Sequence, residues 1–219
     1  MENEKKLYNA FSDALKEEYG EKVYKIPVNL PITCPNRDGT VGCGGCTFCG
    51  EKGTGFESQD NMMAVEKQIE ENINHIAHKY AAEKYIAYFQ NFSNTFIPLD
   101  DFKNDISKAV LPNMVEICIS TRPDCIAYPY LDFLKEIKDK HGINITIELG
   151  LQTTNVHSLI KVNRGHTLAE FIDAVYMIKN YDFKICAHVI LNLPWDDEDD
   201  VIEMAKVLSA LKVDYAKAH

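Results

Sequence analysis

The stretch VEICISTRPDCIAYPYLDFLKEIKDKHGINITIELGLQT, residues 115–153, decides the fold of this chain. It starts as an apolar, β-branched segment, continues through an amphipathic stretch at 127–140, and returns to a second β-branched segment at Ile145. This order predicts two parallel strands joined by a crossover helix, because a tight hairpin cannot connect parallel strands. The unit is therefore strand, helix, strand.

The same alternation extends from this unit toward both ends of the chain. Further strand-like segments begin near Val23, Tyr85, Lys184 and Val213, and amphipathic stretches lie at 65–80, 99–110, 155–180 and 199–211. Six parallel strands with helices outside predict an α/β fold, either a doubly wound sheet or a complete or partial barrel. The G-x-G-x-x-G fingerprint of a dinucleotide fold is absent, and a cysteine loop stands in its place.

The ends of the chain frame this core. Residues 1–22 predict a helical extension in which Leu7, Phe11 and Leu15 lie at helical spacing before a stop at Gly20. The core follows at 23–219, with the cysteine loop at 34–55. Pro27 in the first strand favours an edge position or a bulge. The last strand reaches His219 without a closing helix, so we expect a C-terminal part to be missing.

Composition limits the classes of function. The 219 residues are 46% hydrophobic, and 33 acidic against 23 basic side chains give a net charge of −10. That charge disfavours a uniformly basic surface for nucleic acid. The N-terminus is charged and no window approaches the roughly 18 apolar residues of a membrane span. We expect a soluble, cytoplasmic protein that does not bind membranes.

Four of the seven cysteines fall between positions 34 and 49. A secreted disulfide scaffold would be shorter and evenly paired, so the cluster indicates a metal or redox site. Cys46-x2-Cys49 allows two thiolates to hold one metal or cluster. A four-cysteine zinc site, a ferredoxin-like cluster and unligated thiols remain alternatives to a cluster held by three cysteines, which we favour. Cys118 and Cys186 lie in apolar runs and are predicted to be buried thiols.

Six motifs in order along the chain carry a resemblance. After CPNRDGTVGCGGCTFC at 34–49 come Gly53-Thr-Gly-Phe56, Tyr88-Phe-Gln-x-x-Ser-Asn-Thr95, Ser120-Thr-Arg-Pro-Asp124, Glu148-Leu-Gly-Leu-Gln-Thr153, Asn163-Arg-Gly-His-Thr167 and His188-Val-Ile-Leu-Asn-Leu-Pro194. In these residues the chain resembles the radical S-adenosylmethionine (SAM) superfamily, in its Elp3-like branch of the YhcC/YtqA type. The resemblance implies a partial (β/α)6 TIM-like barrel.

The resemblance also implies the cofactors and the chemistry. It assigns Cys34, Cys46 and Cys49 as ligands of a [4Fe-4S] cluster, with the fourth iron free to chelate SAM. In the family, an electron from the reduced cluster cleaves SAM and yields a 5′-deoxyadenosyl radical. Cys43 departs from the family pattern by adding a fourth thiol beside the loop.

A SAM site is implied at the carboxyl ends of the strands. The resemblance places Gln90, Asn91 and Ser93 near the SAM amino group, Arg164 at its carboxylate, and Gln152 at a ribose hydroxyl. Further candidates are Phe48, Glu148 and His188. A surface arginine at 164 and a core histidine at 188 remain alternatives. Two departures from the family pattern concern the contact with the adenine of SAM. Asn192 replaces a glycine, and an acidic run at 196–200 follows Trp195. Alternatively, the acidic run begins a helix and its negative charges complement the helix dipole.

The substrate is the least determined feature. Elp3-like relatives act on C5 of the tRNA wobble uridine, so tRNA is the favoured partner although the net charge opposes it. A reductant protein such as flavodoxin or ferredoxin is also implied. A zinc-stabilised interaction module and an iron–sulfur electron-transfer protein are the alternatives.

Overall fold

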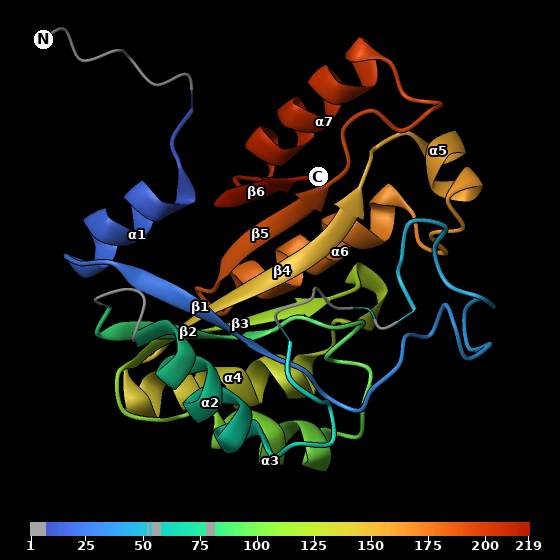
Figure 1. Cartoon of the computed structure of the whole chain (residues 1–219). Coiled ribbons are helices and arrows are strands. Elements are labelled where there is room, and N and C mark those ends of the chain that lie inside the picture. Colours follow the sequence, from blue (N-terminus) through green and yellow to red (C-terminus); the bar gives the residue numbers. More distant parts are fainter. Residues whose placement is uncertain (1–7, 52, 54–57, 78–81) are drawn as a thin grey trace, which may run out of the picture.

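The computed structural model describes residues 8–51, 53, 58–77 and 82–219, and these form a single curled sheet with helices around it (Figure 1). The strands are β1 (Val23–Val28), β2 (Lys84–Phe89), β3 (Met114–Thr121), β4 (Asn144–Gln152), β5 (Lys184–Val189) and β6 (Tyr215–Ala218). Every neighbouring pair is parallel, and the order in the sheet is the order in the chain. The predicted partial barrel is confirmed.

Helices connect the strands. They are α1 (Phe11–Tyr19), α2 (Val65–Ala77), α3 (Leu99–Lys108), α4 (Tyr128–His141), α5 (Val156–Lys161), α6 (Leu168–Lys179) and α7 (Glu198–Ala210), with a 3₁₀ turn at Pro123–Cys125. The last three residues of the helix predicted at 65–80, residues 78–80, lie outside the described residues. Of the described helices, none is long and apolar enough to cross a membrane.

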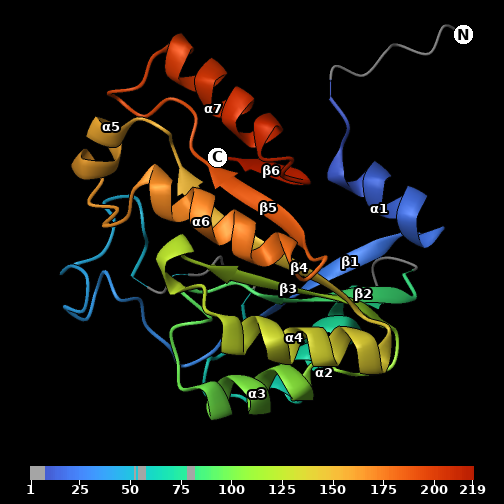
Figure 2. The same cartoon turned by 180° about the vertical axis from the view of Figure 1, so that it is seen from behind.

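The two faces of the sheet differ in chemistry because successive side chains of a strand point to opposite faces. On the outer face, Ile117, Ile147 and Ile185 are fully buried under the helices, of which α4 and α6 are seen in front in Figure 2. On the inner face, the register places Ser120 beside Glu148 and Glu148 beside Cys186. The inner face therefore carries polar side chains at these positions, while the outer face carries the main hydrophobic core.

Helix α1 packs on the inner face of the sheet. Its Leu15 lies in an apolar cluster with Tyr88 and Cys118. The Tyr19 hydroxyl donates to Glu116 at 2.7 Å and accepts from Asn144 at 2.9 Å. Gly20 ends the helix with φ of +75°, as its position predicted. The expected contribution of Leu7 lies outside the described residues.

The stretch at 155–180 is interrupted, which its apolar spacing did not predict. Asn155 caps α5 by accepting from the backbone N–H groups of residues 157 and 158, and Thr167 with Glu170 forms a capping box that starts α6. The loop between them, 162–167, lies at the carboxyl end of the sheet. Pro27 lies in β1, which is an edge strand, so the expectation from the proline is confirmed.

Candidate functional site

The cysteine loop lies beyond the carboxyl ends of the strands (Figure 1). Cys34, Cys46 and Cys49 line one cavity of about 160 Å³. Cys43 is exposed and is not part of this lining. The structure thus brings three of the four cysteines to one cavity and leaves Cys43 exposed outside its lining, an arrangement that does not favour the four-cysteine alternatives. All seven cysteines are free thiols.

A network of amide groups holds this loop in place. The Asn36 side chain is fully buried and donates to the backbone carbonyl of Asn163 at 2.5 Å and toward the Cys46 sulfur at 3.5 Å. In return, the Asn163 side chain donates to the carbonyl of Gly45 at 2.8 Å. Arg37 donates to the carbonyl of Gly50 at 2.7 Å. The 162–167 loop therefore holds the backbone of the cysteine loop in position through hydrogen bonds.

Arg164 lines the cavity and is buried, with only 6% of its surface exposed. Its Nη2 donates to the carbonyl of Gly150 at 2.7 Å, and its Nη1 lies 3.5 Å from the Cys46 sulfur. A Cβ atom at position 150 would come within 2.4 Å of Nη2, so glycine makes room for the guanidinium. The Nε atom is buried without a hydrogen-bond partner among the described residues. The surface-arginine alternative is wrong.

Gln152 reaches the cavity through an irregularity in β4. The pairing with β5 shifts register between Gly150 and Gln152, and Gln152 has φ of +75°. Left-handed backbone is costly for a residue with a Cβ atom, and such outliers cluster at functional sites. The bulge redirects the glutamine side chain to the cavity that Arg164 also lines.

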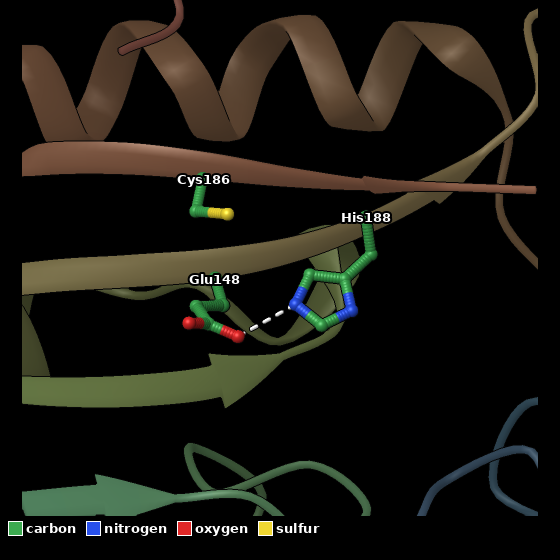
Figure 3. A group of neighbouring side chains, drawn as sticks. All are labelled: Glu148, Cys186 and His188. Carbon is green, nitrogen blue, oxygen red and sulfur yellow. Dashed lines mark hydrogen bonds and ion pairs between the residues drawn. The ribbon is translucent and has the colours of Figure 1, made fainter. Parts of the chain in front are cut away.

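Glu148 connects the cavity to a buried ion-pair network. Its Oε2 lies 2.6 Å from Nε2 of His188 (Figure 3), and its Oε1 pairs with the ammonium of Lys25. Burial by itself would raise the pKa of Glu148, but the His188 hydrogen bond and the Lys25 charge hold that pKa below its usual range. Glu148 is therefore an ionised carboxylate whose required partners are Lys25 and His188.

Sequence reasoning missed two basic residues: Arg122, which lines the cavity, and Lys25, which pairs with Glu148. Lys25 occupies an inner-face position of a strand that is otherwise mostly buried, and that polar residue in an apolar strand was the available signal. Arg122 lines the cavity and forms a two-pronged pair with Asp124 at 2.8 and 2.7 Å. Its Nη1 also donates to the carbonyl of Arg164 at 2.8 Å. Its signal was its place in the Ser120–Asp124 motif.

The remaining predicted site residues divide into two groups. Phe48, Gln90, Glu148 and His188 line the cavity. Asn91 and Ser93 do not: Asn91 donates to and accepts from the backbone of Leu30, and Ser93 contacts Thr121. These two side chains thus stabilise the loops at the carboxyl ends of the strands and do not face the cavity.

The two departures near β5 have local explanations. Asn192 has φ of +68°, a conformation that glycine adopts freely and that asparagine tolerates better than most other residues. The acidic run provides the N-cap of α7 through Asp197 and its reciprocal partner Asp200. The helix-capping interpretation of that run is confirmed.

The donor set of the cavity fits a metal–sulfur cluster with an amino-acid ligand. Three cysteines line one space, and two N–H donors are directed at the Cys46 sulfur. Burial raises the pKa of the Cys34 thiol, and a bound metal ion would favour its thiolate form. The buried guanidinium with its unpaired Nε offers donors for a carboxylate.

Comparison with known proteins identifies the family. The model of the radical SAM superfamily matches residues 34–208. The chain is 34% identical over 218 residues to the uncharacterized protein YtqA of Bacillus subtilis, covering 99% of this chain and 67% of the relative. It is 36% identical over 216 residues to protein YhcC of Escherichia coli, covering 98% and 68%. The chain thus spans about two thirds of the length of these relatives.

Two further likenesses concern the Elp3-like expectation. The fold of Elp3 from Methanocaldococcus infernus matches with a TM-score of 0.62 at 15% identity, over 90% of this chain and 45% of that chain. A tRNA uridine(34) acetyltransferase of Methanocaldococcus jannaschii is 33% identical over 84 residues, covering 38% of this chain and 14% of the relative. The first shows the shared fold, and the second is a short local match.

Proposed function

Because this chain belongs to the radical SAM superfamily, whose members use a [4Fe-4S] cluster and SAM, we propose that Cys34, Cys46 and Cys49 hold the cluster here. The observation that carries the proposal is the shared cavity of the three sulfurs, from which Cys43 is excluded. When bound, these groups supply the reductive cleavage of SAM to a 5′-deoxyadenosyl radical.

The protein's own residues bind and orient SAM in this proposal. The Arg164 guanidinium pairs with the SAM carboxylate, since a planar cation matches that group. Gln152 and the Glu148–His188 pair face the same cavity and bind the ribose hydroxyls, while Gln90 and Phe48 complete the wall. Asn36 and Arg164 direct N–H groups toward Cys46 and stabilise charge on its sulfur.

The test is anaerobic reconstitution followed by chemical reduction. We expect about four irons per chain, absorbance near 400 nm, and formation of 5′-deoxyadenosine and methionine from SAM. A colourless protein that binds zinc through its cysteines contradicts the proposal. A coloured, fully reduced protein that leaves SAM intact would instead favour an electron carrier.

We further propose that the substrate is tRNA, at C5 of the wobble uridine. The local match to a tRNA uridine(34) acetyltransferase and the fold shared with Elp3 support this choice. The experiment uses tRNA from a strain in which the gene is deleted. After incubation with the reduced protein and SAM, mass spectrometry of the digested tRNA is expected to show a mass change confined to the wobble uridine.

An external reductant is a general need of the superfamily, and we propose flavodoxin or ferredoxin for this role. A reducing compartment keeps cysteines available as cluster ligands, so we place the reaction in the cytoplasm. Reduced flavodoxin replacing dithionite is expected to sustain 5′-deoxyadenosine formation.

A further inference from the structure

Arg37 binds the backbone where the Cys46-x2-Cys49 segment ends. Its Nη2 donates to the carbonyl oxygens of Cys49 at 3.2 Å and of Gly50 at 2.7 Å, and its Nη1 donates to that of Glu51 at 3.3 Å. One planar guanidinium thus holds three successive carbonyl groups, because its donors form a rigid fork. The first of these groups belongs to a proposed cluster ligand.

A glycine and an aromatic ring hold this guanidinium in place. A Cβ atom at position 45 would lie 2.9 Å from the Nε atom of Arg37 and 3.0 Å from its Cγ atom, so the backbone of Gly45 packs directly on the side chain. The guanidinium carbon lies 5.0 Å from the centre of the Phe92 ring, which is a cation–π contact. Both Arg37 and Phe92 line the cysteine cavity. The positive charge therefore has a defined position in the cavity wall.

Phe92 adopts a backbone conformation that is costly for a bulky residue. Its φ is +46°, in the left-handed region where a Cβ atom is crowded. A Cβ atom at position 53 would lie 2.6 Å from the Phe92 ring, so a glycine is needed there as well. Strained residues of this kind persist where the surrounding structure requires them, and they cluster at functional sites. The ring contact with Arg37 gives this strain a function at the cysteine cavity.

The charge of Arg37 bears on the reduction of the proposed cluster. A [4Fe-4S] cluster with three thiolate ligands is already anionic, and reduction adds one further negative charge. A nearby cation stabilises the reduced state more than the oxidised state, and solvent screens a half-buried cation such as Arg37 less than one in open water. The carbonyl groups that Arg37 binds carry no net charge and do not cancel its own. Arg122 and Arg164 line the same cavity, but Arg122 is paired with Asp124 and Arg164 is proposed to pair with SAM.

We propose that Arg37 is a positioning residue that holds the backbone of residues 49–51 and whose charge raises the reduction potential of the cluster. Phe92 keeps the guanidinium at its place in this arrangement. The proposal rests on the proposed function, because it presumes a cluster at Cys34, Cys46 and Cys49. Its consequence is that a weaker reductant suffices to supply the one electron that SAM cleavage requires.

The test is an anaerobic redox titration of the reconstituted full chain with dithionite, in which paramagnetic resonance measures the reduced cluster. Arg37→Gln removes the charge and keeps an N–H donor. We expect the equilibrium constant for its one-electron reduction to fall at least about tenfold, which is a shift of about 59 mV to more negative potential. Arg37→Lys retains the charge and should stay within about threefold of wild type. Lys206→Met, at an exposed position on α7, is the matched control and should leave the potential unchanged.

Hydrogen exchange of the cluster-free chain tests the positioning role separately. The backbone N–H of Cys49 donates to the carbonyl of Cys46 at 3.0 Å, within the segment that Arg37 holds. We expect faster exchange over residues 45–51 in Arg37→Gln and in Phe92→Leu, because each variant weakens the hold on that backbone. Lys206→Met should exchange as wild type does.

An unchanged potential in Arg37→Gln, or unchanged exchange in both Arg37→Gln and Phe92→Leu, overturns the proposal. If Arg37→Gln assembles no cluster, Phe92→Leu takes its place in the titration. This variant retains the charge but releases the guanidinium from the ring, so its potential should fall as well, and an unchanged value overturns the proposal. A wild-type chain that assembles no [4Fe-4S] cluster contradicts the proposed function instead. A normal cluster with unchanged potential in the Arg37 variants contradicts only the role of Arg37.

Discussion

The guanidinium of Arg164 lies 3.5 Å from the sulfur of Cys46, although 118 positions separate the two residues in the chain. The contact joins the loop that precedes α6 to the loop that follows β1. Through it, the residue proposed to hold the SAM carboxylate also touches a proposed cluster ligand. The proposed function therefore predicts that cluster assembly and SAM binding are coupled at one side chain.

Arg164→Ala is expected to weaken SAM binding by about 10- to 150-fold, which corresponds to the loss of a charged hydrogen bond. Arg164→Lys keeps the charge but loses the planar fork, so we expect an intermediate loss. SAM titration of the reconstituted protein measures both. Lys161→Ala, an exposed site on α5, is the control. An unchanged affinity in Arg164→Ala would leave the arginine with a structural role alone.

Cys34 and Cys43 should respond differently to substitution. Cys34→Ala is expected to abolish the cluster and SAM cleavage together, because Cys34 lines the cavity of the other two sulfurs. Cys43→Ala is expected to retain both, because Cys43 is exposed. Iron analysis and paramagnetic resonance distinguish them. The reverse pattern would assign Cys43, Cys46 and Cys49 as the ligands.

We expect Gln152 to lower the free energy of unfolding through its left-handed backbone and to strengthen SAM binding through its side-chain amide. Gln152→Gly relieves a left-handed backbone that costs about 1–2 kcal/mol with a Cβ atom, against roughly 0.5–1 kcal/mol of added chain entropy. We therefore expect a stability equal to wild type or up to about 1 kcal/mol higher in urea unfolding. Gln152→Ala retains the strain and serves as the control. Both variants should bind SAM about 3- to 10-fold less tightly because the amide is lost.

His166 should make the fold sensitive to acid. Burial, together with the Arg164 charge, lowers the pKa of His166 to about 4. The unfolded chain has an ordinary histidine pKa near 6.5 and binds the proton first, so stability is present above about pH 6.5 and declines as the pH falls toward 4. The expected loss is on the order of 3 kcal/mol.

Urea unfolding at several pH values measures this loss. His166→Gln should be less stable at neutral pH and show a flatter dependence between pH 6.5 and 4. His157→Gln, at an exposed position on α5, should behave as wild type. An identical pH dependence in wild type and His166→Gln would assign the acid sensitivity to other groups.

The sequence by itself determined the order of strands and helices and the candidate ligands. Alternation of apolar segments fixed the parallel sheet, since each crossover helix returns the chain to the same end. The CxxC spacing singled out Cys46 and Cys49, and the resemblance to the radical SAM superfamily implied Cys34, Gln152 and Arg164. The strand and helix pattern is local, because it is set by side-chain period and chain direction within a few residues.

Tertiary structure decided which of these residues meet and which support them. The interruption of 155–180 depends on two helix caps, and it delivers Arg164 to the cavity. Lys25 became the partner of Glu148 because the curl of the sheet brings together inner-face residues of β1 and β4, two strands that do not pair with each other and whose residues lie 123 positions apart. No local pattern encodes such a contact, because its energy arises only when the sheet curls and excludes water from both charges.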